Sequence, residues 1–98
     1  MLDKFIFWVN QFQDLSFGAD IQFQLTESEY SSNPSARLDI DTPSMIARVT
    51  CWNSGDYNAE IIDIETESTI FSFNGSFEHP EKISLELSTF FELIGISI

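Results

Sequence analysis

The sequence is poor in the residues that build disulfides, metal sites and nucleic-acid interfaces. It has one cysteine, one histidine and only four Lys and Arg residues among 98. A single cysteine excludes an internal disulfide and suits a reducing compartment. Nucleic acids and anionic membranes attract proteins through basic patches, so the scarcity of cations argues against either partner. No run approaches the ~20 apolar residues of a membrane-spanning helix.

Acidic residues dominate what is present. Sixteen Asp and Glu residues give a formal net charge of −12, beyond the magnitude of ~2–8 that suffices for the solubility of a small domain. Many cytosolic proteins are acidic, which explains part of this charge, but the excess favours a basic partner. The first 15 residues lack the basic region and cleavage site of a signal peptide, so we expect a cytoplasmic protein.

The chain has enough apolar residues for one core. Hydrophobic residues make up 43% of the sequence, with ten phenylalanines, and this content argues against disorder. At a length of 98 residues, we expect a single domain covering residues 1–98.

Two segments have the apolar spacing of amphipathic helices, residues 2–15 and 80–94. The stripe residues are Leu2, Phe5, Val9 and Phe12 in the first segment, and Ile83, Leu87, Phe90 and Ile94 in the second. Gly18 and Gly95 are the expected ends of these helices, because glycine adopts the left-handed conformation of a helix C-terminus.

Between the helices, five segments have the composition and alternation of β-strands. They cover residues 20–27, 37–42, 45–52, 57–65 and 69–74. Gly55 predicts a tight hairpin turn between the third and fourth strands. The alternation of the fourth strand slips at Ile61 and Ile62, which indicates a β-bulge. The Asn-Gly-Ser stretch at 74–76 is expected to end the sheet.

These elements predict an α+β fold. We expect a two-layer sandwich in which a five-stranded antiparallel meander carries the N-terminal and the C-terminal helix on one face. The other face then stays open to water or to a partner. Phe7 and Leu85 lie off the helix stripes, so they offer a helical surface that is an alternative to the open face of the sheet as the place where a partner binds.

The open face and its turns supply the candidate partner-binding residues. Tryptophan and arginine are enriched in interfaces, and carboxylates suit a basic partner. The candidates are Asp39, Asp41, Arg48, Trp52, Asp56, Asp63, Glu65 and Glu67. A solvated acidic strand face, with a tryptophan that fills the end of the core, is the simpler interpretation of the same residues.

Catalytic and metal-binding motifs are weak. Asp39 and Asp41 resemble the paired aspartates of haloacid-dehalogenase phosphatases, but that chemistry needs a parallel α/β fold that this chain is too short to build. The acidic pairs lack the glycine-containing loop of calcium sites, and zinc has too few Cys and His ligands. His79 is expected in a surface loop, and Cys51 is expected inside as a small core residue. We therefore expect no enzyme, no cofactor and no metal.

Residues along most of the chain resemble a family of bacterial immunity proteins. The matching residues are Phe5, Trp8, Ala47, Arg48, Trp52, Gly55, Glu60, Ile61, Ile62, Asp63, Glu65 and Thr66. Glu67 departs from the pattern, because a turn glycine is expected there. Members of the family protect cells against toxins of contact-dependent growth inhibition. The subgroup concerned neutralises tRNA nucleases that work with elongation factor Tu.

The resemblance implies an inhibitor, monomeric on its own, that binds the C-terminal nuclease domain of one toxin and meets elongation factor Tu only through that toxin. The charge agrees with this, since a nuclease must be basic to hold RNA. Opposite charges steer association towards ~10⁸–10⁹ M⁻¹s⁻¹ at low salt. An acidic secretion chaperone and a nucleic-acid mimic remain the alternative functions.

Overall fold

The computed structural model describes residues 1–13, 20–28 and 32–96. The elements in chain order are α1 (Leu2–Gln13), β1 (Gln22–Ser28), β2 (Ser35–Asp41), β3 (Met45–Trp52), β4 (Asp56–Asp63), β5 (Thr69–Ser76), the 3₁₀ turn η1 (Pro80–Lys82), α2 (Ile83–Glu86) and α3 (Ser88–Leu93). Each strand pairs antiparallel with its neighbour in the chain, in the order β1-β2-β3-β4-β5. This arrangement confirms the predicted α+β fold.

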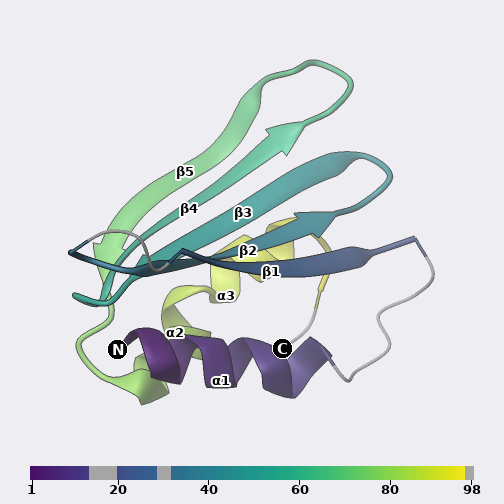
Figure 1. Cartoon of the computed structure of the whole chain (residues 1–98). Helices are drawn as coiled ribbons and strands as arrows, with labels where there is room; N and C mark the ends of the chain where they lie inside the picture. The colour runs from purple at the N-terminus through teal and green to yellow at the C-terminus, as the bar shows by residue number, and fades with distance from the viewer. Residues whose placement is uncertain (14–19, 29–31, 97–98) are drawn as a thin grey trace.

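The helices lie together on one side of a strongly twisted sheet (Figure 1). Side chains alternate along the central strands between fully buried and partly exposed positions. Leu38, Val49 and Ile61 occupy buried positions on three neighbouring strands and form the floor of the core. The opposite surface of the sheet, called the outer face below, is covered by none of the described elements (Figure 1).

Helix α1 is fastened to the C-terminal helices through Trp8. Its indole Nε1 donates a hydrogen bond to Ser84 Oγ at 2.8 Å. Its ring also packs edge-on with the ring of Phe91, and the ring centroids are 5.8 Å apart. Phe5 and Val9 are fully buried, as the stripe predicts. The end predicted at Gly18 lies outside the described residues. None of the helices in the described part of the chain has the length and apolar content to cross a membrane.

The C-terminal stripe is buried as predicted, although the helix is not continuous. Ile83, Leu87, Phe90 and Ile94 are each at most 4% exposed. The helix changes from 3₁₀ to α between Lys82 and Ile83 and is interrupted at Leu87, which divides the segment into η1, α2 and α3. Gly95, at φ +80°, ends α3 as predicted. The amides of Gly95 and Ile96 bond the carbonyls of Glu92 and Phe91, which satisfies the last turn.

A stack of aromatic rings joins the sheet to the helices. Tyr57 of β4 packs face to face on Phe77, with ring centroids 4.1 Å apart, and Phe77 lies against Phe5 of α1. The Tyr57 hydroxyl donates to Glu86 Oε1 at 3.2 Å. One tyrosine therefore contacts the sheet, the segment that leaves β5, and α2.

The expectation that Asn74–Ser76 ends the sheet is wrong, because β5 continues to Ser76. Gly75 pairs with Tyr57 across the strands. A Cβ atom at position 75 would lie 2.8 Å from Tyr57 Oη and 2.9 Å from Phe73 Cε1. Glycine is needed at this position because the Tyr57 ring approaches the backbone closely, and the residue lies within a strand and not in a turn.

The bulge is present at the predicted place, but the extra residue is on the neighbouring strand. Ile61 pairs with Phe71 and Ile62 pairs with Thr69, which leaves Ile70 of β5 as the additional residue. Strand β4 therefore alternates without a slip, and Ile62 is on the outer face, opposite Ile46. The expectation that Asp63 faces outward is wrong, since Asp63 pairs with Met45 on the register that faces the helices.

Gly75→Ala is expected to lower the free energy of unfolding by ~1–3 kcal/mol, because the added methyl group overpacks the Tyr57 ring. Urea denaturation of both proteins measures the difference. Gly95→Ala is the matched control, since nothing lies within 4 Å of its Cβ and only the positive φ is strained, at about 1 kcal/mol. A Gly75→Ala variant with wild-type stability would contradict the packing explanation.

Candidate partner-binding surface

The strand register arranges the side chains of the outer face in rows that cross the sheet. The middle row contains Gln24, Asp39, Arg48, Glu60 and Ser72. Another row, towards the β2–β3 and β4–β5 loops, contains Gln22, Asp41, Ile46, Ile62 and Thr69. The eight candidate residues fall into three groups along the sheet, and Asp63 is the one among them whose register puts it on the side that faces the helices.

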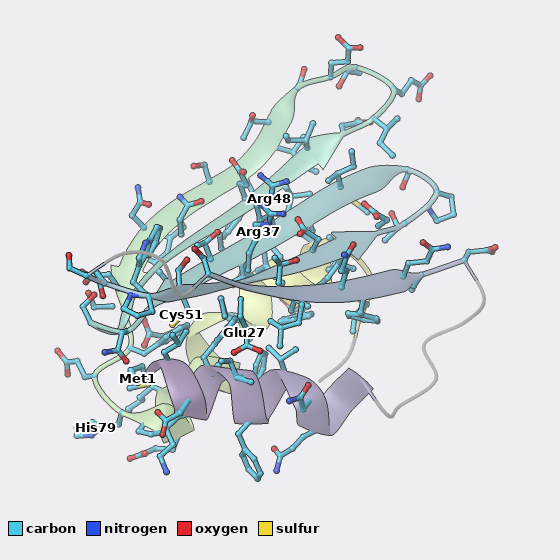
Figure 2. All side chains as sticks on the ribbon, in the orientation of Figure 1. Met1, Glu27, Arg37, Arg48, Cys51 and His79 are labelled. Carbon is cyan, nitrogen blue, oxygen red and sulfur yellow. The ribbon has the colours of Figure 1, made fainter. Side chains whose placement is uncertain are left out.

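The first group, Asp39 and Arg48, lies at the centre. Asp39 accepts from Arg37 Nε and from Arg48 Nε, each at 2.9 Å. The two arginines lie close together over the sheet (Figure 2). The Asp39 side chain is 16% exposed, against 44% and 42% for the arginines. Two guanidinium groups hold one carboxylate, so the centre of the outer face is not acidic.

The second group, Trp52 and Asp56, lies at the end next to the β3–β4 turn. Trp52 is half-buried and pairs with Ser35. The Asp56 carboxylate accepts hydrogen bonds from the hydroxyls of Ser54 and Ser76. Through these two hydrogen bonds, Asp56 connects the β3–β4 turn to the end of β5. Gly55 takes a positive φ in this turn, as the sequence predicts.

The third group gathers at the opposite end of the sheet, and it contains four of the eight candidates. Asp41 ends β2, Asp63 ends β4, and Glu65 and Glu67 are exposed in the loop that follows β4. The Ile64 amide donates to the Ser44 carbonyl at 3.0 Å, so the two loops at this end lie side by side. The four cations of the chain lie elsewhere, on α1, η1 and the centre of the outer face.

Isoleucines share this end with the carboxylates. Ile46, Ile64 and Ile70 are 40%, 45% and 49% exposed, and Ile62 is half-buried. We call the surface of these residues the isoleucine end. It consists of Asp41, Ile46, Ile62, Asp63, Ile64, Glu65, Glu67 and Ile70. A shallow hollow of about 340 Å³ adjoins it, lined by Asp20, Gln22, Asp41, Thr42 and Pro43.

The sequence reasoning did not select the isoleucines. The alternation of the third strand puts Ile46 outward beside Arg48, which was a usable signal. Ile62 and Ile70 gave no such signal, because assigning the bulge to the fourth strand turned Ile62 inward and left Ile70 unremarkable.

Cys51 and His79 are in the surroundings expected for them. Cys51 is fully buried on β3, and this burial raises the pKa of its thiol from 9.0 to about 12. His79 is exposed in the turn before η1. Within residues 1–13, 20–28 and 32–96, no three His, Cys, Asp or Glu side chains group in the manner of metal ligands.

The chain matches a protein-family model, described as immunity protein TriTu, over residues 3–93. This match confirms the family resemblance found in the sequence. A comparison with curated proteins finds no match. The matched range covers all five strands, the C-terminal helices and α1 from its second residue, and it includes every residue of the isoleucine end.

Glu67→Gly is expected to raise the free energy of unfolding by ~0.5–1 kcal/mol. Glu67 has φ +58° and is the one non-glycine residue with positive φ among the described residues. Glycine adopts this conformation without steric cost, although it adds entropy to the unfolded chain. Urea denaturation is the measurement. The neighbouring variant Glu65→Gly should lower stability instead, and equal effects of the two substitutions would contradict the assignment.

The Cys51 thiol is expected to react with an aromatic disulfide reagent at pH 8 at least ~100-fold more slowly in the native protein than in denaturant, because burial keeps it protonated. The raised pKa stabilises the fold below about pH 9, and that contribution is lost as the pH rises towards 12. Absorbance at the thiolate product wavelength follows the reaction. Rapid native reaction would show that β3 opens readily.

Proposed function

This chain belongs to the TriTu family of immunity proteins, and we propose that it protects its own cell by binding one cognate toxin and blocking it. The observation that carries the proposal is the family match over residues 3–93. The net charge of −12 and the uncovered outer face support it, because they suit a pre-formed surface for a basic protein.

The mechanism we propose is inhibition by occupancy, without catalysis. A nuclease holds RNA through cations, and an acidic protein bound there competes with the phosphates for them. Charge complementarity also speeds the encounter, which matters when a toxin must be caught before it acts. Inhibition of this kind needs no cofactor or metal from the immunity protein.

The finer identity of the toxin follows from the family resemblance in the sequence. We propose that the toxin is the C-terminal tRNA nuclease domain of a contact-dependent growth inhibition system. The immunity protein would bind it one to one in the cytoplasm, where tRNA is found, as a monomer before binding. Elongation factor Tu would join the assembly only through the toxin, with no direct nucleic-acid or membrane contact.

The nucleic-acid mimic is the less favoured function. Such a mimic needs carboxylates spaced like phosphates along a continuous surface. Here both arginines lie at the centre of the outer face and bind Asp39, which interrupts that surface. An acidic secretion chaperone would bind a client without abolishing its activity, so an activity measurement separates it from an immunity protein.

Co-expression with the toxin domain encoded beside it should restore growth of cells that the toxin alone arrests. The purified pair should elute as a one-to-one complex on size-exclusion chromatography. A toxin from a different immunity pair serves as the control and should still arrest growth. Absence of both protection and complex would contradict the immunity function. Arrest without loss of intact tRNA would contradict only the tRNA nuclease assignment.

A further inference from the structure

We propose that the toxin docks on the isoleucine end of the outer face, with Ile46 and Ile70 as apolar anchors inside an acidic rim. This inference rests on the proposed immunity function and adds the surface that performs it. The partner surface that fits is an apolar patch bordered by lysines or arginines.

The first support is the grouping of exposed apolar side chains. Single exposed isoleucines are ordinary on a protein surface, whereas a contiguous group marks an interaction site. Ile46 and Ile62 are directly opposite each other on paired strands, and Ile70 is the bulge residue beside Ile62. The pairing of β3 with β4 holds Ile46 and Ile62 in place, so little conformational entropy is lost when they bind.

The second support is the charge around the isoleucines. Asp41, Glu65 and Glu67 lie among them, and Asp20 borders the hollow beside Asp41. Asp63 adds charge at the same end of the sheet, but on the side that faces the helices. None of the four cations of the chain lies at this end. A second copy of this chain would bring the same carboxylates against themselves. The rim therefore favours a basic partner over self-association.

The other surfaces fit a basic partner less well. At the centre of the outer face, Asp39 is held by two arginines, which would repel cations. On the helices, the exposed Phe7 and Leu85 each have a lysine three residues before them, Lys4 and Lys82. Side chains three residues apart lie on the same side of a helical turn. Cations therefore accompany the exposed apolar residues of the helical surface.

The apolar test uses Ile46→Ser and Ile70→Ser, with the dissociation constant of the purified toxin measured by calorimetry. Each substitution is expected to raise Kd at least ~10-fold, as truncation of an interface anchor does. Phe7→Ser and Leu85→Ser are the controls, since they remove apolar side chains of the helices that are 64% and 66% exposed, more than either isoleucine. The controls should keep Kd within about twofold of the wild type.

The charge test compares two double substitutions that remove the same charge from opposite sides of the protein. Glu65→Gln with Glu67→Gln changes the rim, and Glu78→Gln with Glu81→Gln changes an exposed segment around η1. The rim variant should slow association by ~3–10-fold at low salt, an effect that high salt removes. The η1 variant should slow it less.

The outcomes separate this inference from the immunity function. If the wild type neither binds nor protects against the toxin, both are overturned. If the wild type binds but the isoleucine and rim variants bind equally well, the docking surface alone is overturned. Loss of binding in the Phe7 and Leu85 variants would move the site to the helices. Sedimentation that shows a wild-type dimer disrupted by Ile46→Ser or Ile70→Ser would make this end a self-interface. If circular dichroism shows that one serine variant does not fold, the other serine variant and the rim variant still test whether the toxin docks on the isoleucine end.

Discussion

The packing of Tyr57 is the constraint on which the layered structure depends. Its ring has Phe77 stacked on one face and the backbone of Gly75 at its edge, and its hydroxyl reaches Glu86. These contacts fix the place where the chain leaves β5 and the side on which the following helices lie. Because the helices all lie on that side of the sheet, the outer face remains uncovered (Figure 1). The open surface is thus a consequence of core packing.

The distribution of charge matters more than its total. Most of the acidic excess is spread over the surface, and the two arginines bind a single aspartate at the centre of the outer face. That arrangement leaves the carboxylates at the isoleucine end without cations beside them. A partner that approaches the sheet therefore meets a change in potential along it, and this change supplies orientation as well as attraction.

The fold was predicted well from the sequence, because apolar residues recur along each strand and helix with the period of the face that is buried. Alternation located the five strands, and the stripes located the buried faces of the helices. Gly75 was misassigned, since Asn-Gly-Ser is a local turn signal whereas the contact with Tyr57 joins two strands. The bulge was assigned to the wrong strand for a similar reason: a register shift belongs to a pair, and one strand cannot show which partner has the extra residue. Of the candidate site, the carboxylates were identified, but their separation into three groups and the isoleucines among them required the register.

The meander has a consequence for the speed with which this protein becomes active. Each strand pairs with the strand next to it in the chain, so most sheet contacts join residues that are close in sequence. Chains rich in such contacts have low contact order and fold quickly. The isoleucine end is made by two hairpins, β2–β3 and β4–β5, which are themselves neighbours in the sheet. The strand pairings that make this surface can therefore form without a search for distant segments, whereas the contact of Trp8 with Ser84 joins residues 76 apart and waits for the C-terminal helices.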